Sequence, residues 1–231
     1  MPIFVTLVSS LAAIAASTAG AAFDHPPAVQ LEPNTPATGS DLLLDVRSRS
    51  GVPTGERAQS LVLSAPSGFR IAPRAVRGRC GTRAARSFSC PEASRIGSGQ
   101  VEGHASGALV PDGRLDFAAT IDAFLARPVQ PGDVAGLVLE VSEPMTGKRG
   151  ALAGRVVRTP AGVELRFDDI AGAQPSVPGV GISIDRVLLR AGAGRLITTP
   201  PACAGSWQFR LTVTYADHRD VRDEPVACST G

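Results

Sequence analysis

The sequence predicts an all-β protein, a β-sandwich with an immunoglobulin-like or jelly-roll-like arrangement of about 10–12 short strands. Three observations lead to this fold class. Glycine and proline are abundant, with 25 and 19 residues, which favours many turns between short elements. Apolar and polar residues alternate with a period of two in one segment after another, as in strands with one buried face. No segment has the pattern of a long amphipathic helix.

The first predicted strands follow a proline-rich N-terminal stretch. Residues 23–40 have an extended, proline-rich character, and an edge strand is predicted within them at 29–31. Alternating apolar residues then predict strands at 42–46 and 61–63.

The middle of the chain predicts a hairpin. Residues 98–110 lead into Asp112-Gly113, a dipeptide typical of tight hairpin turns. The following segment, 115–125, has apolar residues at six consecutive odd positions. A few of these also fit helical spacing, but the alternation matches more of them, so a strand is favoured.

Five further strands complete the predicted fold, at 136–141, 152–158, 163–167, 182–190 and 207–215. The last has the clearest alternation and is expected to bury the only tryptophan, Trp207, and the only tyrosine, Tyr215. It is expected to pair with the chain before Cys228 in a terminal hairpin.

The N-terminus predicts export. Residues 3–22 are almost all apolar or small and end in Ala-Gly-Ala-Ala, which is typical of signal-peptidase sites. Residues 1–21 are therefore expected to be a signal peptide, although no basic residue precedes the apolar run; an uncleaved membrane anchor is the alternative. Residues 22–231 are expected to form one compact domain, with a boundary near 103–107 as a second interpretation. They contain no other membrane-length apolar run, so a secreted or cell-wall-associated protein without a further transmembrane segment is expected.

Export makes disulfides the natural interpretation of the four cysteines. Cys80, Cys90, Cys203 and Cys228 allow three pairings, which sequence cannot separate. The pairs 80–90 and 203–228 are favoured because each closes a short loop, and each would stabilise the fold by about 3 kcal/mol. A zinc site is disfavoured because no Cys-x-x-Cys pair is present.

The main charge feature is an arginine-rich segment. Residues 70–95 hold seven arginines and a single acid, Glu92, whereas residues 112–143 hold six acids and two arginines. A disulfide loop would gather these cations on one surface that could contact an anionic partner. Alternatively, the segment is a solvated loop paired with the acidic one. The candidate patch consists of Arg74, Arg77, Arg79, Arg83 and Arg86.

Other chemistry finds little support in the sequence. Neither G-x-S-x-G, H-E-x-x-H, a P-loop nor G-x-G-x-x-G occurs. No histidine has an evident carboxylate partner, and the adjacent Asp168 and Asp169 would point to opposite faces of a strand. The acidic stretch 217–224 is expected to be a solvated turn rather than a calcium site. No catalytic residue, metal or cofactor is predicted, and scarce aromatic residues argue against nucleic-acid binding.

Two cysteine-containing blocks carry a recognisable pattern. One includes P-S-G-F from Pro66, I-A-P-R-A from Ile71, and C-P-E-A-S-R-I-G-S-G from Cys90; the other includes C-A-G-S-W from Cys203 and T-Y-A-D from Thr214. These blocks resemble uncharacterised secreted β-rich proteins of actinobacteria. Ala72 and His218 depart from the usual Asn and Gly. The resemblance implies export, disulfides and β structure, and no particular activity.

These observations favour a secreted, non-catalytic binding or cell-surface structural module. Its expected partner is a cell-wall polymer or another extracellular protein. The alternative is an extracellular hydrolase acting on carbohydrate, which would need two carboxylates facing each other across a groove.

Overall fold

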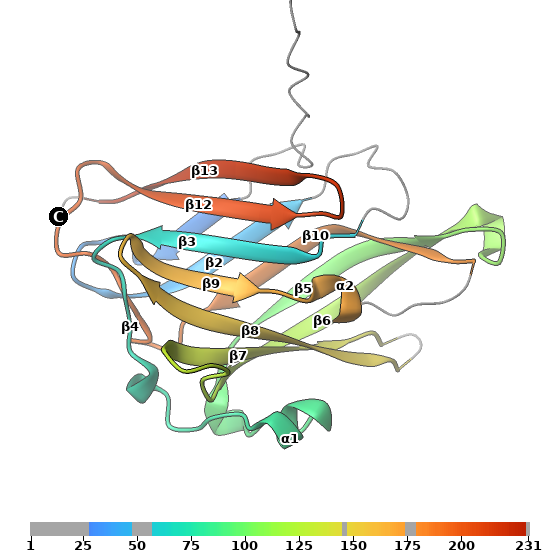
Figure 1. Ribbon diagram of the computed structural model, residues 1–231, viewed down its shortest axis with the longest axis horizontal. Helices are drawn as coiled ribbons and strands as arrows, with labels where there is room; N and C mark the ends of the chain where they lie inside the picture. Colours follow the sequence, from blue (N-terminus) through green and yellow to red (C-terminus); the bar gives the residue numbers. More distant parts are fainter. Residues whose placement is uncertain (1–27, 48–56, 145–146, 174–178, 230–231) are drawn as a thin grey trace, which may run out of the picture.

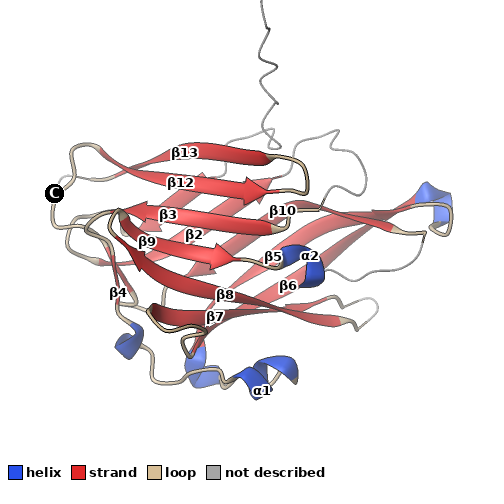
Figure 2. Cartoon of the chain, in the orientation of Figure 1, coloured by secondary structure: helices blue, strands red, loops and turns tan. Residues whose placement is uncertain are grey.

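The structure is a computed structural model and describes residues 28–47, 57–144, 147–173 and 179–229; the predicted signal peptide lies outside these ranges. The strands are β1 (Ala28–Glu32), β2 (Gly39–Arg47), β3 (Ser60–Pro66), β4 (Arg70–Ile71), β5 (Arg95–Ser106), β6 (Arg114–Ala126), β7 (Asp133–Ser142), β8 (Arg149–Thr159), β9 (Gly162–Phe167), β10 (Gly181–Ala191), β11 (Ile197–Thr198), β12 (Ser206–Thr214) and β13 (Arg219–Ala227). The helical segments are short: η1 (Pro73–Ala75), α1 (Thr82–Arg86), η2 (Glu92–Ser94), η3 (Pro111–Gly113) and α2 (Ile170–Ala173) (Figure 2).

The strands form one antiparallel sheet. Their order is β13-β12-β3-β9-β8-β7-β6-β5-β10-β2-β11-β4, and β1 pairs with β2 beside this path. The all-β prediction is confirmed, but two separate sheets are not seen in the described residues. A twisted sheet this wide can bury one face by curling on itself, so a single sheet supplies both sides of the core.

The curled sheet has two layers around an apolar core. In Figure 1, β12, β3 and β9 lie in front of β2 and β10. Leu63 and Phe209 from the front layer belong to the same buried cluster as Leu44 and Leu189 from the back layer. The predicted alternation therefore points one face of each strand toward a shared interior.

The two ends of the sheet meet near the C-terminus. β1 contacts β13, and the loop after β1 is tied to the chain end. The Asn34 side-chain amide donates to the Ala227 carbonyl at 3.3 Å, and the Ser229 backbone N–H donates to the Asn34 carbonyl at 3.1 Å. These bonds hold the curled sheet closed at one end.

Most predicted strands are present, with informative differences. Segment 115–125 is part of β6 and pairs with β5 as a hairpin, but the predicted tight turn is wrong: β5 ends at Ser106, which pairs with Arg114, so residues 107–113 connect the strands. Within this loop φ is positive at Asp112 (54°) and Gly113 (73°). The two-residue strands β4 and β11 were not predicted, because two residues are too few to show alternation.

Two glycines let β5 lie close to β10. A Cβ atom at Gly97 would collide with the Arg190 carbonyl oxygen, and one at Gly99 with the Leu188 carbonyl oxygen. The Ile-Gly-Ser-Gly sequence of β5 is therefore explained by backbone approach between neighbouring strands.

The outer parts of β5, β6 and β10 project from the core as an arm, seen at the right of Figure 1. Residues 103–106, where the alternative domain boundary falls, lie in β5 and pair with both β6 and β10. The arm ends in exposed apolar side chains, Leu109 and Leu115.

Both favoured disulfides are present, Cys80–Cys90 and Cys203–Cys228. The second joins the chain before β12 to the chain after β13, across the predicted terminal hairpin. Trp207 on β12 is buried, and its ring packs edge-on against Phe69. Tyr215 is only partly buried and stacks on His218, because β12 ends one residue before it.

Candidate anionic-ligand site

The arginine-rich segment, defined here as residues 70–95, covers an outer face of the sheet. It runs through β4, η1, α1 and η2 before entering β5, along the lower side of the molecule in Figure 1. Under it lies a second, small apolar cluster built around Cys80, Phe124, Ala126 and Val138. Since Phe124, Ala126 and Val138 come from β6 and β7, the segment is packed on the sheet.

Backbone bonds and the first disulfide fix the segment to β6. The Cys80 N–H donates to the Leu125 carbonyl at 2.8 Å, and the Arg127 N–H donates to the Cys80 carbonyl at 3.4 Å. Cys80 and Ala126 thereby form a parallel bridge. The bond to Cys90 then closes the loop that contains α1.

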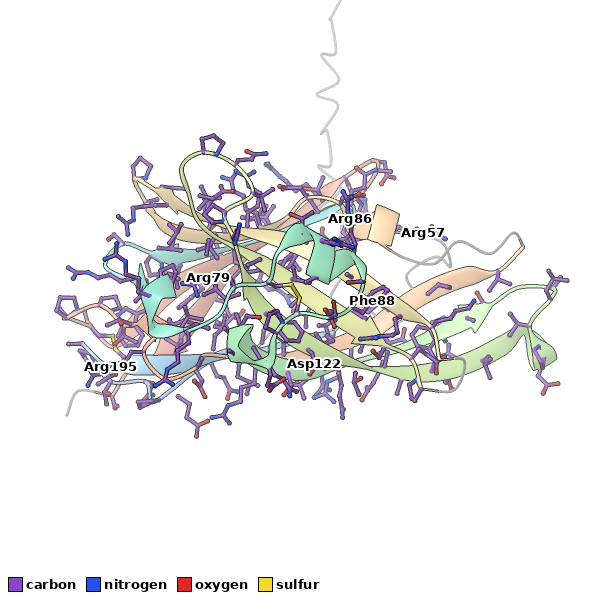
Figure 3. The ribbon with its side chains drawn as sticks, turned by 90° about the horizontal axis from the view of Figure 1, so that it is seen from below. Arg57, Arg79, Arg86, Phe88, Asp122 and Arg195 are labelled. Carbon is purple, nitrogen blue, oxygen red and sulfur yellow. A yellow bond between two sulfur atoms is a disulfide. The ribbon has the colours of Figure 1, made fainter. Side chains whose placement is uncertain are left out.

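A buried carboxylate anchors the far end of this loop. Glu140 on β7 is only 6% exposed. One of its oxygens accepts the Cys90 backbone N–H at 3.4 Å, and the other lies 3.3 Å from the Arg149 guanidinium. Arg149 also sits over the Phe88 ring, 4.9 Å from its centroid, and donates to the Phe88 carbonyl at 3.1 Å. Figure 3 shows Phe88 beside the disulfide.

Arg79 has an internal role that its sequence position does not reveal. Its guanidinium donates to three backbone carbonyls of the same segment, those of Pro73, Val76 and Gly78, with the Val76 bond at 2.7 Å. The predicted patch therefore changes, because Arg79 holds the turn together and uses three of its five N–H donors inside the segment.

The remaining patch arginines are exposed and unpaired. Arg74, Arg77, Arg83 and Arg86 are exposed. Within the described ranges they form no hydrogen bond or ion pair, and the same holds for Arg70 at the start of the segment. Arg86 and Arg79 are labelled in Figure 3, which views this side of the molecule from below.

The acidic segment does not neutralise these cations. Among its six acids, Asp122 pairs with Arg95 at the end of the arginine-rich segment, whereas Asp133 and Glu140 pair with Arg155 and Arg149 of β8. The alternative interpretation, in which the two segments pair with each other, therefore applies to Arg95 alone.

Arginines elsewhere on the sheet are commonly paired. Both Arg186 nitrogens that contact Asp45 lie 2.8 Å from its carboxylate oxygens. Hydrogen bonds from Arg186, with a second contribution from Arg47, lower the pKa of Asp45 to about 2. Hydrogen bonding by Arg155 likewise lowers the pKa of Asp133. Such pairs neutralise the arginine charge on the sheet. The exposed arginines of the arginine-rich segment, Arg74, Arg77, Arg83 and Arg86, have no such partner among the described residues.

The structure also brings together a histidine and a carboxylate that are distant in sequence. His104 Nδ1 lies 2.8 Å from Asp185 Oδ2, because the β10 bulge at residue 185 turns this side chain toward β5. Arg114 is 3.7 Å from the same carboxylate. In the part of the chain that is described, no hydroxyl hydrogen-bonds to the other ring nitrogen of His104, so these three side chains form a polar cluster on the arm.

The other acidic candidates have separate partners. Asp168 lies 3.6 Å from Arg155, whereas Asp169 accepts the Gly172 N–H at 3.0 Å. Residues 219–224 belong to β13 rather than to a turn, and Asp223 pairs with Arg210. No group of three or more potential metal ligands occurs within the described ranges.

No described helix is both long and apolar enough to cross a bilayer. Comparison with known proteins finds no matching protein-family model, no matching curated protein and no matching solved structure.

Proposed function

We propose that this protein is a secreted, non-catalytic binding module whose arginine-rich segment binds an anionic polymer of the cell wall. The observation that carries the proposal is the group of exposed, unpaired guanidinium groups of Arg74, Arg77, Arg83 and Arg86 on a fixed support. Export is supported by the apolar N-terminus and by the two disulfides, which persist in oxidising compartments.

The fixed support favours binding over a merely solvated loop. A flexible segment would lose conformational freedom when its cations engage a partner, whereas an ordered one has lost much of it beforehand. The disulfide, the Cys80–Ala126 bridge and the contacts of Glu140 and Arg149 supply this order. Guanidinium groups suit phosphate and carboxylate groups, to which they can donate two hydrogen bonds.

The test is co-sedimentation of the mature protein with isolated cell walls across a salt series. Arg77→Ala/Arg83→Ala/Arg86→Ala should weaken binding about tenfold to hundredfold, since each cation near an anionic surface contributes about 1 kcal/mol. Added salt should weaken wild-type binding by screening the same contacts.

A matched control variant removes the same charge elsewhere. Arg158 and Arg219 are also exposed and have no ion pair within the described ranges. Arg158→Ala/Arg219→Ala should bind nearly as the wild type does, whereas Arg83→Ala/Arg86→Ala should bind more weakly. Equal weakening by these two double variants would reduce the effect to net charge and contradict a site on the segment. Binding to a protein fraction of the wall, but not to its polymers, would contradict the proposed partner.

A further inference from the structure

The interior of the curled sheet contains an apolar cavity of about 100 Å³. Every strand from β1 to β12 contributes at least one lining side chain, and all sixteen lining residues are Ala, Val, Leu, Ile or Phe. Natural cores are close-packed, and an empty space of this size deprives its lining of contacts. Water would find no polar group to bond, so an occupant has to be apolar.

Small side chains leave this space open. Ala65 on β3 and Ala191 on β10 both line the cavity, from opposite layers of the sheet. A leucine at either position could occupy part of the volume, and leucine already lines much of the rest. The cavity is therefore left open by the small side chains at these two positions, and a larger apolar residue there would fill part of it.

The partly buried lining residues of the cavity mark where it approaches the surface. Two of them, Ala65 and Leu165, lie on the neighbouring strands β3 and β9, whereas the other four lie on β2, β4, β10 and β11: Leu42, Ile71, Ala191 and Ile197. Ile71 and Ile197 belong to the two-residue strands β4 and β11, which pair with each other. We therefore place the entrance at the β4–β11 strip.

Free positive charge lies next to this entrance. Arg70 precedes Ile71, and Arg195 is two residues before Ile197; both arginines are exposed and unpaired within the described ranges. The nearby acids Glu32 and Asp41 share the guanidinium of Arg190, at 3.0 and 3.1 Å, which offsets one of their two negative charges, so Arg70 and Arg195 still leave this rim net positive. A ligand with an apolar end and an anionic head would match both the cavity and its rim.

We propose that this cavity binds the apolar end of a small anionic amphiphile, with the head held at the surface by Arg70 and Arg195. The volume of about 100 Å³ is somewhat below the roughly 150 Å³ of an apolar cavity that admits benzene. A short alkyl tail is therefore the expected fit. Arg70 and Ile71 belong to the arginine-rich segment, but the polymer-binding proposal rests on Arg74, Arg77, Arg83 and Arg86, so neither proposal depends on the other.

The test is calorimetric titration of the mature protein with three six-carbon probes: hexanoate, hexan-1-ol and hexylammonium. Hexanoate should bind most tightly and hexylammonium least. Isoleucine methyl NMR signals should shift at Ile71 and Ile197. Absence of hexanoate binding and of methyl shifts at about 10 mM, a Kd scale near the weakest specific binding, would overturn the proposal.

Variants separate tail from head recognition. Ala65→Leu, and separately Ala191→Leu, should weaken hexanoate binding about tenfold or more by occupying the cavity, which is about the effect of removing a buried methylene or two. Ala118→Leu, at an exposed position on β6, is the matched control and should bind normally. Unchanged affinity in folded Ala65→Leu and Ala191→Leu proteins would contradict the cavity as the site.

Arg70→Ala/Arg195→Ala should lower the affinity for hexanoate about threefold to tenfold and leave hexan-1-ol unaffected. If both probes respond equally, head recognition by these arginines is wrong. Arg195→Ala, which lies outside the arginine-rich segment, should still sediment with cell walls, whereas Arg77→Ala/Arg83→Ala/Arg86→Ala should still bind hexanoate. These experiments therefore distinguish failure of the cavity proposal from failure of the polymer-binding proposal.

Discussion

Arginine has opposite roles on two surfaces of this protein. On the outer face of β2, β10, β5 and β6, guanidinium groups such as those of Arg186 and Arg114 lie against aspartates on the same or the next strand. On the arginine-rich segment, Arg77, Arg83 and Arg86 have no acidic partner among the described residues. The sheet face pairs its arginines within the protein, whereas these arginines of the segment are left unpaired.

The difference follows from backbone geometry. Cross-strand neighbours in a sheet have Cβ atoms about 5 Å apart, so an Arg and an Asp on adjacent strands meet without further support. A segment without regular strands has no such neighbour row. Its order instead depends on the disulfide, on Arg79 and on Glu140, and these contacts leave the exposed arginines unused.

The largest expected effect comes from removing the covalent anchor of the segment. Cys80→Ala/Cys90→Ala should lower the free energy of unfolding by about 3 kcal/mol on the chain-entropy model and also weaken cell-wall binding. Chemical denaturation and co-sedimentation measure the two effects. Cys203→Ala/Cys228→Ala should destabilise by a similar amount, but the folded fraction should bind normally. If removal of either disulfide weakens wall binding equally, the segment is not a separate functional unit.

Asp45→Asn tests the sheet face on which arginines pair with aspartates, called the paired face below. The pKa of Asp45 is lowered from 3.8 to about 2 in the folded protein, so its ionised form stabilises the fold above pH 4, and this contribution is lost as the pH falls toward 2. The substitution should lower the free energy of unfolding by about 1–2 kcal/mol at neutral pH and flatten its dependence on pH between 4 and 2. Wall binding should not change. A wild-type protein with no loss of stability over this pH range would argue against the pairing.

Arg79→Ala separates the structural arginine of the segment from its exposed, unpaired ones. Loss of three charge-assisted bonds to carbonyls should destabilise the turn by about 1–2 kcal/mol, seen as faster amide exchange at residues 73–80. Arg77→Ala should change stability by less than about 0.5 kcal/mol. Equal exchange rates in the two variants would show that Arg79 does not stabilise the turn and belongs with the exposed arginines.

Arg114→Ala gives the smallest expected effect. Its partners Asp116 and Asp185 are 74% and 40% exposed and Arg114 itself 56%, and ion pairs this accessible contribute about 0.5 kcal/mol or less each. Thermal unfolding and wall binding should both stay close to the wild type. A marked loss of wall binding would show that the paired face also contacts the polymer.

The fold class was readable from the sequence, but its topology was not. Alternation in segments such as 115–125 and 207–215 reports which side of a strand is buried, and the structure agrees. Alternation does not report which strands are neighbours. β3 and β12, almost 150 residues apart, lie side by side through pairs such as Leu63 with Leu211. The two layers form one curled sheet because the strands between them, β8, β7 and β6, pair without a break.

The candidate site was predictable in composition only. A count of arginines identified the segment, and the spacing of cysteines favoured the disulfide that closes it. Nothing local to Arg79 distinguishes it from Arg77, and nothing near Glu140 indicates that it binds Cys90, fifty residues earlier. The same holds for His104 and Asp185, which a bulge brings together.

The sequence by itself therefore determined the local properties of the chain: β structure from alternation, turns from glycine and Asp-Gly, and an excess of positive charge over residues 70–95. Only the tertiary structure decided which charges are neutralised and where the core is left unfilled. Pairing and packing depend on distances between residues remote in sequence, and those distances are set by the order of the strands in the sheet. The free arginines and the apolar cavity are both consequences of that order.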